Sequence, residues 1–266
     1  VLAGHDNDAA VGLGRDAVAY QEATGETSRW TNSIFSGMPT YQISPSYEST
    51  NKLALLSHIY SLGMDGVLCY VFVYLLGFYI LLRTLRLRPW LSAIGAVAWA
   101  FSSYFFIIIA AGHIWKVMTL GFVPPTIAGL ILCYRGRWLW GGAVPALFTA
   151  LQILSNHIQM SYYFGFVMLC IVLAYGIAAL VPAKTEPAPD AILPRISFRK
   201  WLVGTAIFVA GGMVGFFANV PKPYPTYDYA QSTMRRPAEP TPTPPQGQPA
   251  AANPTSTGLP YAPITP

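Results

Sequence analysis

The sequence lacks acidic residues over most of its length. Its 266 residues include only 11 Asp and Glu, and none lies between Gly66 and Val181. Charged residues of both signs make up 10% of the chain, whereas a soluble domain carries roughly a quarter. Because a water-exposed surface needs charged groups, residues 66–181 have the composition of lipid-embedded protein. We predict that this stretch lies in a bilayer.

Cysteine is also scarce. Cys69, Cys133 and Cys170 each fall inside an apolar run, which indicates small core hydrophobes and not a disulfide framework or a metal site. The net charge of +5 would favour nucleic acid as the partner of a soluble protein. Here the basic residues gather in connections between apolar runs, so we expect membrane lipids and no nucleic acid as partners.

Apolar segments long enough to cross a bilayer recur along the chain. A crossing takes about 20 helical residues, and six segments approach that length: 66–85, 90–111, 117–134, 138–155, 160–181 and 201–220. The third and fourth are short. The predicted fold is an all-α polytopic membrane protein with six transmembrane helices.

Lysine and arginine are distributed unevenly between the two sides of this arrangement. The connections after the first, third and fifth segments hold nine of them: Arg83, Arg86, Arg88, Arg135, Arg137, Lys184, Arg195, Arg199 and Lys200. The other short connections hold only Lys116. By the positive-inside rule the nine are cytoplasmic. The N-terminal loop and the C-terminal tail are then extracytoplasmic.

This orientation predicts three parts. Residues 1–65 form an extracytoplasmic loop region with short interfacial helices, 66–220 the six-helix domain, and 221–266 an extracytoplasmic Pro-rich segment. In the first part, residues 51–63 place Leu53, Leu56 and Tyr60 on one side and suit an interfacial helix. The stretch SRWTNSIFSGMPTYQIS has neither helical nor strand periodicity and is predicted as an ordered loop or a re-entrant one.

Two polar clusters interrupt the apolar segments on the predicted outer side. His113 and Lys116 are three residues apart, so on a helical turn they face the same way and can clamp a lipid phosphate. The alternative is a Lys that snorkels to water beside a structural His. Asn156, His157 and Gln159 form the second cluster, for which helix capping is the alternative.

Carboxylates for acid–base chemistry must come from outside the spans. A catalytic base is usually a carboxylate or a neutral His at the reacting hydroxyl. The candidates are the N-terminal loop, Asp65 and Asp228. Asp6, in the motif GHD, is the foremost of them and the candidate ligand of a divalent cation; the alternative is a solvated loop acid.

Five motifs resemble, in order, the YfhO family of bacterial membrane proteins. They are GHD, WTNSIFSGMPTYQ, SSYFFIIIAAGHIWK, ALQILSNHIQMSYY and TYDYAQSTMR, and the resemblance covers residues 1 to about 236. Members of that family look like GT-C glycosyltransferases, which transfer a sugar from a polyprenyl-phosphate carrier on the outer side of the membrane. The resemblance also implies that this chain is a piece of a longer protein and that the piece lacks the first span and the C-terminal part.

The resemblance implies roles for individual residues. Asp6 takes the acidic catalytic position, and His113 and Lys116 hold the donor phosphate. The residues that match the remaining motifs would bind substrate: Trp30, Asn32, Met38, Tyr41, Asn156, His157, Gln159, Tyr227 and Arg235.

Two other classes of function remain open. A non-catalytic subunit or scaffold of a larger complex would use the polar clusters to hold helices together. A haem or quinone protein would use His113 and His157 at one membrane face, although no C-x-x-C-H motif is present. A glycosyltransferase accounts for Lys116 and for the acidic loop as well.

Overall fold

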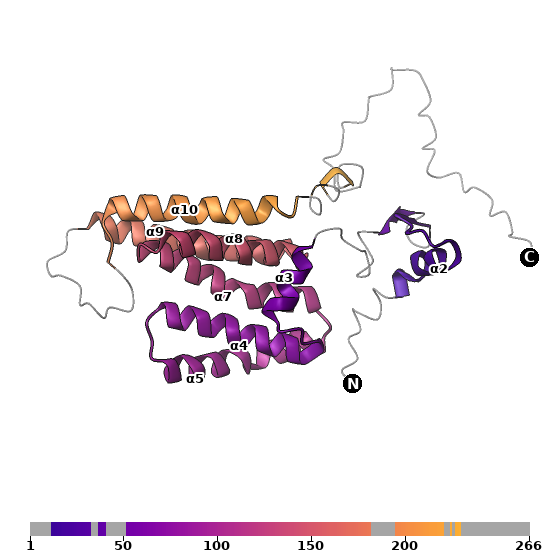
Figure 1. Cartoon of the computed structure of the whole chain (residues 1–266), viewed down its shortest axis with the longest axis horizontal. Helices are drawn as coiled ribbons and strands as arrows, with labels where there is room; N and C mark the ends of the chain where they lie inside the picture. The colour runs from indigo at the N-terminus through magenta and orange to yellow at the C-terminus, as the bar shows by residue number, and fades with distance from the viewer. Residues whose placement is uncertain are drawn as a thin grey trace, which may run out of the picture. The chain divides into compact units, whose positions relative to one another are not determined.

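The structure, a computed structural model, describes residues 12–32, 37–40, 52–181, 195–220, 224 and 227–229. Contacts divide the chain into two units, Val1–Tyr224 and Pro225–Pro266. The first unit contains the long helices (Figure 1). Of the second, one helical turn at 227–229 is described.

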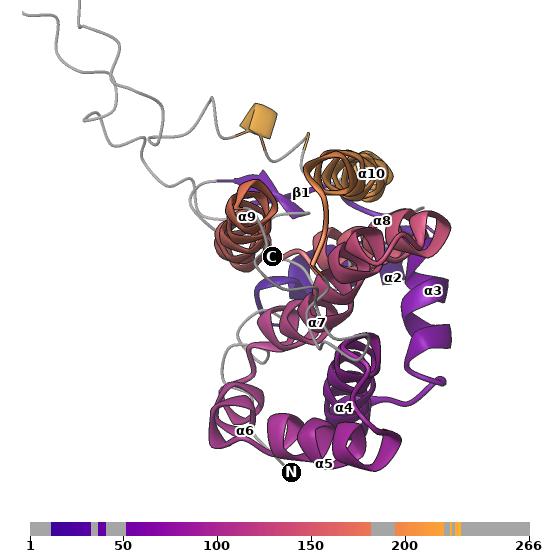
Figure 2. The same cartoon turned by 90° about the vertical axis from the view of Figure 1, so that its left-hand side faces the viewer.

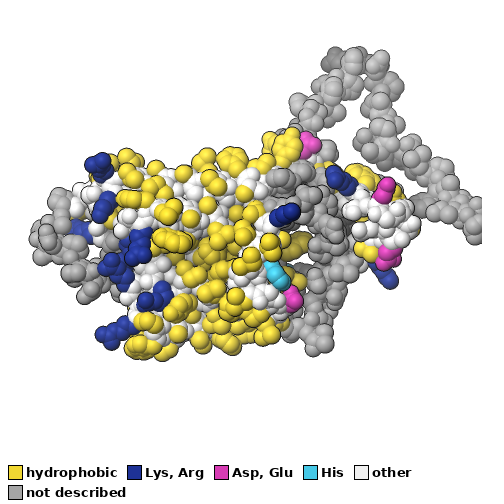
Figure 3. All heavy atoms as spheres, viewed as in Figure 1, with side chains coloured by type: hydrophobic (Ala, Val, Ile, Leu, Met, Phe, Trp, Pro, Cys, Tyr) yellow, Lys and Arg dark blue, Asp and Glu magenta, His cyan; other side chains and the backbone are white. Residues whose placement is uncertain are grey.

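Within the described residues, four helices are long and apolar enough to cross a membrane, which confirms the prediction of a largely helical chain with several such helices. They are α4 (Gly66–Thr84), α7 (Ile114–Tyr134), α9 (Ile158–Leu180) and α10 (Phe198–Phe217). Helix α8 (Trp138–Leu154) is apolar but has only 17 residues. Hydrophobic side chains cover the flank of these helices, and Lys and Arg gather at one end (Figure 3).

The segment predicted at 90–111 is broken. Helix α5 (Pro89–Ala100) and helix α6 (Ser103–Ala110) meet at an angle of 43°. Ser102, between them, has the extended conformation with ψ of 142°. The break lets two rings contact α4: Trp99 stacks on Phe78 at 4.7 Å and Phe105 on Tyr74 at 4.1 Å between ring centres. Apolar composition alone does not reveal such a bend.

Helix α7 is the centre of the bundle. It lies between α4 and α8 (Figure 2), and 83% of its apolar window is buried. It begins at Ile114, three residues before the predicted start, so Lys116 belongs to its first turn. Pro124 and Pro125 lie inside it, where the surrounding helices cover the carbonyl groups that prolines leave without donors.

Helix α9 contrasts with α7, since Gly176 is its only buried residue. Cys69 and Cys133 are buried as predicted, whereas Cys170 on α9 is exposed, so its prediction as a core residue is wrong. A helix that crosses a bilayer at the edge of a bundle keeps such apolar side chains for contact with lipid.

Small residues bring α8 and α10 into close contact. Gly211 and Gly215 form a Gly-x-x-x-Gly pair on α10. A Cβ atom at Gly211 would lie 2.4 Å from the carbonyl oxygen of Gly142, and one at Gly215 would lie 2.3 Å from that of Ala146. This spacing of small residues allows backbones of membrane helices to touch.

Helix α3 (Leu53–Tyr60) lies against α8. The Tyr60 ring contacts Phe122 and Phe148, with ring centres 5.9 and 5.0 Å away. Leu56, one helical turn before Tyr60, is 40% exposed and so lies at the edge of the side that packs on the bundle. The partly buried positions are Leu53, Ser57 and Tyr60, because the neighbouring helix decides which part of that side is covered.

The N-terminal part contains α2 (Arg15–Thr24) and a short hairpin. Strand β1 (Trp30–Thr31) pairs antiparallel with β2 (Met38–Pro39), in a stretch predicted as an ordered loop. The Thr31 hydroxyl donates to the Asp16 carboxylate at 3.0 Å, which connects the hairpin to α2. Two-residue strands are too short to produce a visible alternation in sequence.

Candidate functional site

The two polar clusters occupy two similar helix–helix turns. Helix α6 is joined to α7 through Gly112 and His113, and α8 is joined to α9 through Asn156 and His157. Gly112 has φ of 83° and Asn156 has φ of 58°, a left-handed conformation that Gly and Asn adopt most readily. Asn156 is thus explained by the turn, although not through the side-chain cap considered from sequence.

In each turn the His occupies the N-cap position of the following helix. The backbone N–H of Val117 donates to the carbonyl of His113 at 3.0 Å, and that of Met160 to His157 at 3.1 Å. Because the N-cap residue directly precedes the first turn of a helix, the two His residues lie at the N-terminal ends of α7 and α9. The local geometry therefore repeats, with one His at each helix start.

The turns lie close enough for their charges to interact. Burial lowers the pKa of His157, a backbone hydrogen bond partly opposes this, and the neighbouring Lys116 and His113 lower the pKa further. Among the described residues, Nδ1 of His157 is buried without a hydrogen-bond partner. His157 is therefore a partly buried imidazole near a cation, an arrangement suited to contact an anion or a hydroxyl.

Lys116 points toward α6 rather than straight out to water. Its Nζ atom lies over the ring of Tyr104, and its side chain is partly buried. In the described part of the chain, no carboxylate forms an ion pair with it. A cation held by a ring but not neutralised by an acid keeps its charge available for an anionic ligand.

Gln159 is engaged along the outer face of α9. Its side-chain amide donates to the Tyr163 hydroxyl at 2.9 Å, and Tyr163 is 51% exposed. Gln159 is therefore directed along the same exposed helix surface as Tyr163, while His157 is partly buried. The structure brings together His113, Lys116 and His157 from the predicted site.

A cavity of about 410 Å³ begins one helical turn below His157. It lies between α9 and helices α7, α8 and α10, and most of its lining is apolar, including Phe164, Met168 and Phe208. From Ser161 to Val172 it follows α9 for about 16 Å. Its dimensions and lining suit an apolar chain.

Two polar residues of this cavity were missed by the sequence reasoning. Gln152 is 6% exposed and donates to the Thr126 hydroxyl at 2.7 Å. Among the described residues, the buried Ser161 hydroxyl has no hydrogen-bond partner. Gln152 stands in an apolar segment, where a polar side chain is by itself a functional signal, so sequence alone offered a reason to select it.

Three predicted substrate-binding residues lie in or beside the hairpin. The Trp30 indole N–H donates to the Asn32 side-chain oxygen at 3.0 Å, and Trp30 is 51% exposed. Gly37 has φ of 119°, and a Cβ there would lie 2.8 Å from the Trp30 indole nitrogen. Met38 pairs with Thr31 across the hairpin. This geometry fixes the Trp30 ring and leaves its face exposed.

The remaining predicted residues cannot be placed with the cluster. Asp6, Tyr41 and Arg235 lie outside the described residues. Tyr227 is exposed and belongs to the second unit. Within the described ranges, no three His, Cys, Asp or Glu side chains come together as a metal site would require.

Comparison with family models, with curated proteins and with solved structures finds no match for this chain.

Proposed function

We propose that this protein is a multi-pass membrane glycosyltransferase of the GT-C type, similar to the YfhO family. It would transfer a sugar from a polyprenyl-phosphate donor to an acceptor on the extracytoplasmic side. The observation that carries the proposal is that the apolar cavity beside α9 begins one helical turn after His157 and about two turns after Lys116, which itself acts on His157. A lipid-linked donor has the same polarity, with a phosphate above a hydrocarbon chain.

The donor is held in two parts. Lys116 and His113 bind its phosphate, and the cavity receives the first isoprene units of its chain. Burial of apolar surface stabilises such a chain by roughly 25 cal/mol per Å². The exposed flank of α9 leaves the cavity next to the lipid from which the donor would enter.

The chemical step is a displacement at the anomeric carbon. The acceptor hydroxyl oxygen forms the new glycosidic bond while the bond from that carbon to the phosphate oxygen breaks. Asp6 accepts the hydroxyl proton, and the ammonium of Lys116 stabilises the charge that develops on the leaving phosphate. Trp30, Asn32 and Met38 contribute to the acceptor side.

The proposal includes six spans and an orientation. The bent pair α5–α6 and the 17-residue α8 would serve as the second and fourth crossings of a bacterial cytoplasmic membrane. The excess of Lys and Arg at the other helix ends supports an orientation with the clustered residues outside. His113, Lys116 and His157 then face the extracytoplasmic space.

Binding of a long-chain polyprenyl phosphate tests the donor site. Lys116→Met should weaken this binding roughly tenfold, because it removes a charge-assisted contact to the phosphate. Lys52→Met removes a Lys at the start of α3 and serves as the control. Equal affinity of Lys116→Met and wild type would mean that Lys116 only snorkels.

Transfer itself is tested at Asp6. Loss of a general base lowers the rate typically 10²–10⁴-fold, so Asp6→Asn should nearly abolish transfer from a lipid-linked sugar while retaining polyprenyl phosphate binding. Asp8→Asn is the matched control and should be milder. Donor binding without transfer in the wild type would favour the alternative, a non-catalytic subunit of a larger complex.

A further inference from the structure

A second cavity lies at the other ends of the helices. Its volume is about 440 Å³, and eight of the residues that the structure describes line it. Four of these eight are arginines, namely Arg83, Arg86, Arg135 and Arg137, and none of the eight is acidic. Arg135, the C-cap of α7, lies 19 positions after Lys116, which is about 28 Å along the helix. This cavity is therefore distinct from the proposed donor site.

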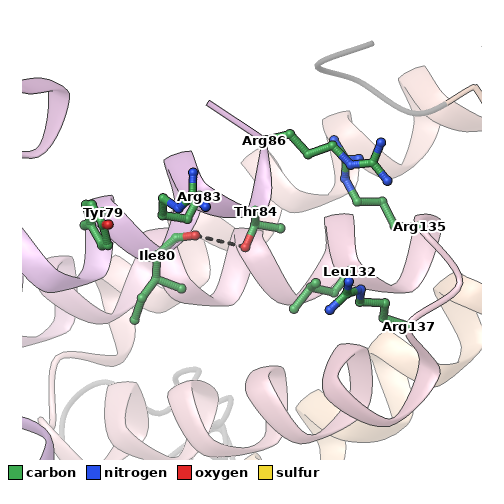
Figure 4. Close-up of a pocket in the computed structure, with 8 residues that line it drawn as sticks. All are labelled: Tyr79, Ile80, Arg83, Thr84, Arg86, Leu132, Arg135 and Arg137. Carbon is green, nitrogen blue, oxygen red and sulfur yellow. Dashed lines mark hydrogen bonds between the residues drawn. The ribbon is translucent and has the colours of Figure 1, made fainter. Parts of the chain in front are cut away.

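The arginines come from two connections that the fold brings together. Arg83 and Arg86 belong to the end of α4 and the turn after it, and Arg135 and Arg137 to the turn between α7 and α8 (Figure 4). Arg86 and Gly136 adopt left-handed backbone conformations, with φ of 65° and 77°. These tight turns hold the guanidinium groups at the ends of the two helices.

Like charges act on one another in this cavity. Burial lowers the pKa of Arg135, and the charges of Arg86 and Arg137 lower it further. Positive-inside topology explains why arginines lie at this end, but it does not require them to line one cavity. A bound anion would offset their mutual repulsion.

The chemistry of the lining selects phosphate. A guanidinium is planar, remains charged at neutral pH and donates two parallel hydrogen bonds to phosphate oxygens. The Thr84 hydroxyl, which donates to the carbonyl of Ile80 at 2.9 Å, and the Tyr79 side chain add polar groups to the lining. A volume of about 440 Å³ exceeds a single phosphate and leaves room for the group esterified to it.

Tryptophans mark this end as a membrane boundary. Trp90 follows Arg88 at the start of α5 and is 57% exposed, and Trp140 follows Arg137 at the start of α8 and is 60% exposed. Exposed Trp gathers at the level of lipid headgroups. The arginine cavity therefore lies where lipid phosphates are concentrated.

We propose that the cavity lined by Arg83, Arg86, Arg135 and Arg137 binds a phosphate-bearing anion, supplied by the headgroup of an anionic membrane lipid. The site goes beyond the proposed function, because it lies at the opposite helix ends and takes no part in sugar transfer. A soluble phosphate ester shares the chemistry and is the other source to be distinguished.

The test measures lipid binding to the full chain by native mass spectrometry. The purified protein is titrated with phosphatidylglycerol and, separately, with phosphatidylcholine. Arg86 and Arg135 take part in other interactions, and the Arg83 guanidinium also donates to the carbonyl of Leu87. Two charges, one from each connection, are removed with Arg83→Gln and Arg137→Gln. The control, Arg199→Gln with Lys200→Gln, removes the same number of charges from the exposed start of α10.

We expect wild type to bind phosphatidylglycerol in preference to phosphatidylcholine. The double Arg83→Gln, Arg137→Gln variant should bind it roughly tenfold more weakly, because two charge-assisted contacts are lost. The control should change binding less than about twofold, as expected for exposed charges. An equal loss in both double variants would overturn the proposal, since any basic surface would then suffice.

Pyrophosphate distinguishes the two sources. If it displaces phosphatidylglycerol from wild type, the cavity recognises the phosphate itself; if it binds while phosphatidylglycerol does not, a soluble ester is the ligand. These wild-type measurements decide the matter even if the double variant fails to fold. Binding of neither probe would overturn the proposal.

Discussion

The ammonium nitrogen of Lys116 lies 5.3 Å from the centre of the Tyr104 ring. The two residues belong to α7 and α6, so their contact spans the turn that holds His113. A Lys at a helix start has a long flexible stem and, without a partner, turns toward water. The Tyr104 ring instead keeps the charge near the His157 side of the bundle.

The contact leads to a prediction for donor binding. Tyr104→Leu should weaken binding of polyprenyl phosphate roughly two- to fivefold, since an exposed cation–π contact contributes about 0.5–1 kcal/mol. Tyr104→Phe keeps the ring and should bind as wild type does. Titration of the three proteins in the same detergent measures the effect. If Phe and Leu weaken binding equally, the hydroxyl and not the ring positions Lys116.

The orientation of the spans predicts which residues are accessible from outside the cell. In a chain whose cysteines are replaced, a membrane-impermeant maleimide applied to intact cells should label the Trp30→Cys variant. The Arg137→Cys variant should be labelled only after the membrane is permeabilised. Both positions are exposed in the structure, so burial does not bias the comparison. The opposite labelling pattern would invert the topology and place the donor site in the cytoplasm.

The lowered pKa of His157 predicts a loss of stability in mild acid. In the unfolded chain a His binds its proton near pH 6.5, whereas burial and the nearby charges delay protonation in the folded protein. Below about pH 6.5 the unfolded state therefore binds more protons at this His than the folded state does, and lowering the pH favours unfolding. Thermal midpoints between pH 7.5 and 5.5 should fall less in His157→Gln than in wild type.

A matched variant isolates this effect. His58→Gln removes an exposed His of α3 and should leave the dependence of the wild-type midpoint on pH unchanged. Identical slopes for wild type and His157→Gln would assign the acid sensitivity to other groups.

Neighbouring glycines of α10 predict opposite effects on stability. At Gly211 a Cβ would lie 2.4 Å from the Gly142 carbonyl oxygen, whereas at Gly212 the nearest atom, the Thr149 hydroxyl oxygen, is 3.9 Å away. Gly211→Ala should destabilise the protein by about 1–3 kcal/mol through overpacking. Gly212→Ala should be neutral or slightly stabilising, because Ala favours the helix. Denaturation in mixed micelles compares them; similar midpoints would show that α8 and α10 separate easily.

The sequence predicts the parts of the fold that depend on composition. Apolar length and missing carboxylates located the helices to within a few residues, because lipid imposes these requirements on each segment separately. The sequence also predicts that His113 and His157 lie close together, because both belong to connections on the same side of the membrane and alternate connections of a polytopic chain meet at one face.

Features that depend on neighbouring helices were not predictable in this way. The bend at Ser102 accompanies the stacking of Trp99 and Phe105 on α4, and the covered positions of α3 depend on its contact with α8. Gln152 and Ser161 line the cavity only because α9 stands apart from α8 there. Hydropathy treats every side of an apolar helix alike, so it cannot say which side faces lipid, another helix or a cavity.

The burial of α7 has a consequence for the biogenesis of the protein. Because it contains two prolines and a Lys, α7 is poorly suited to enter the bilayer from the translocon alone. Helices α4 and α8 cover it once they are in place. Helix α4 is synthesised before α7, and only three residues separate the end of α7 from the start of α8. We therefore expect the ribosome-bound chain to keep α7 at the translocon until α8 has emerged, so that the two leave together as a hairpin.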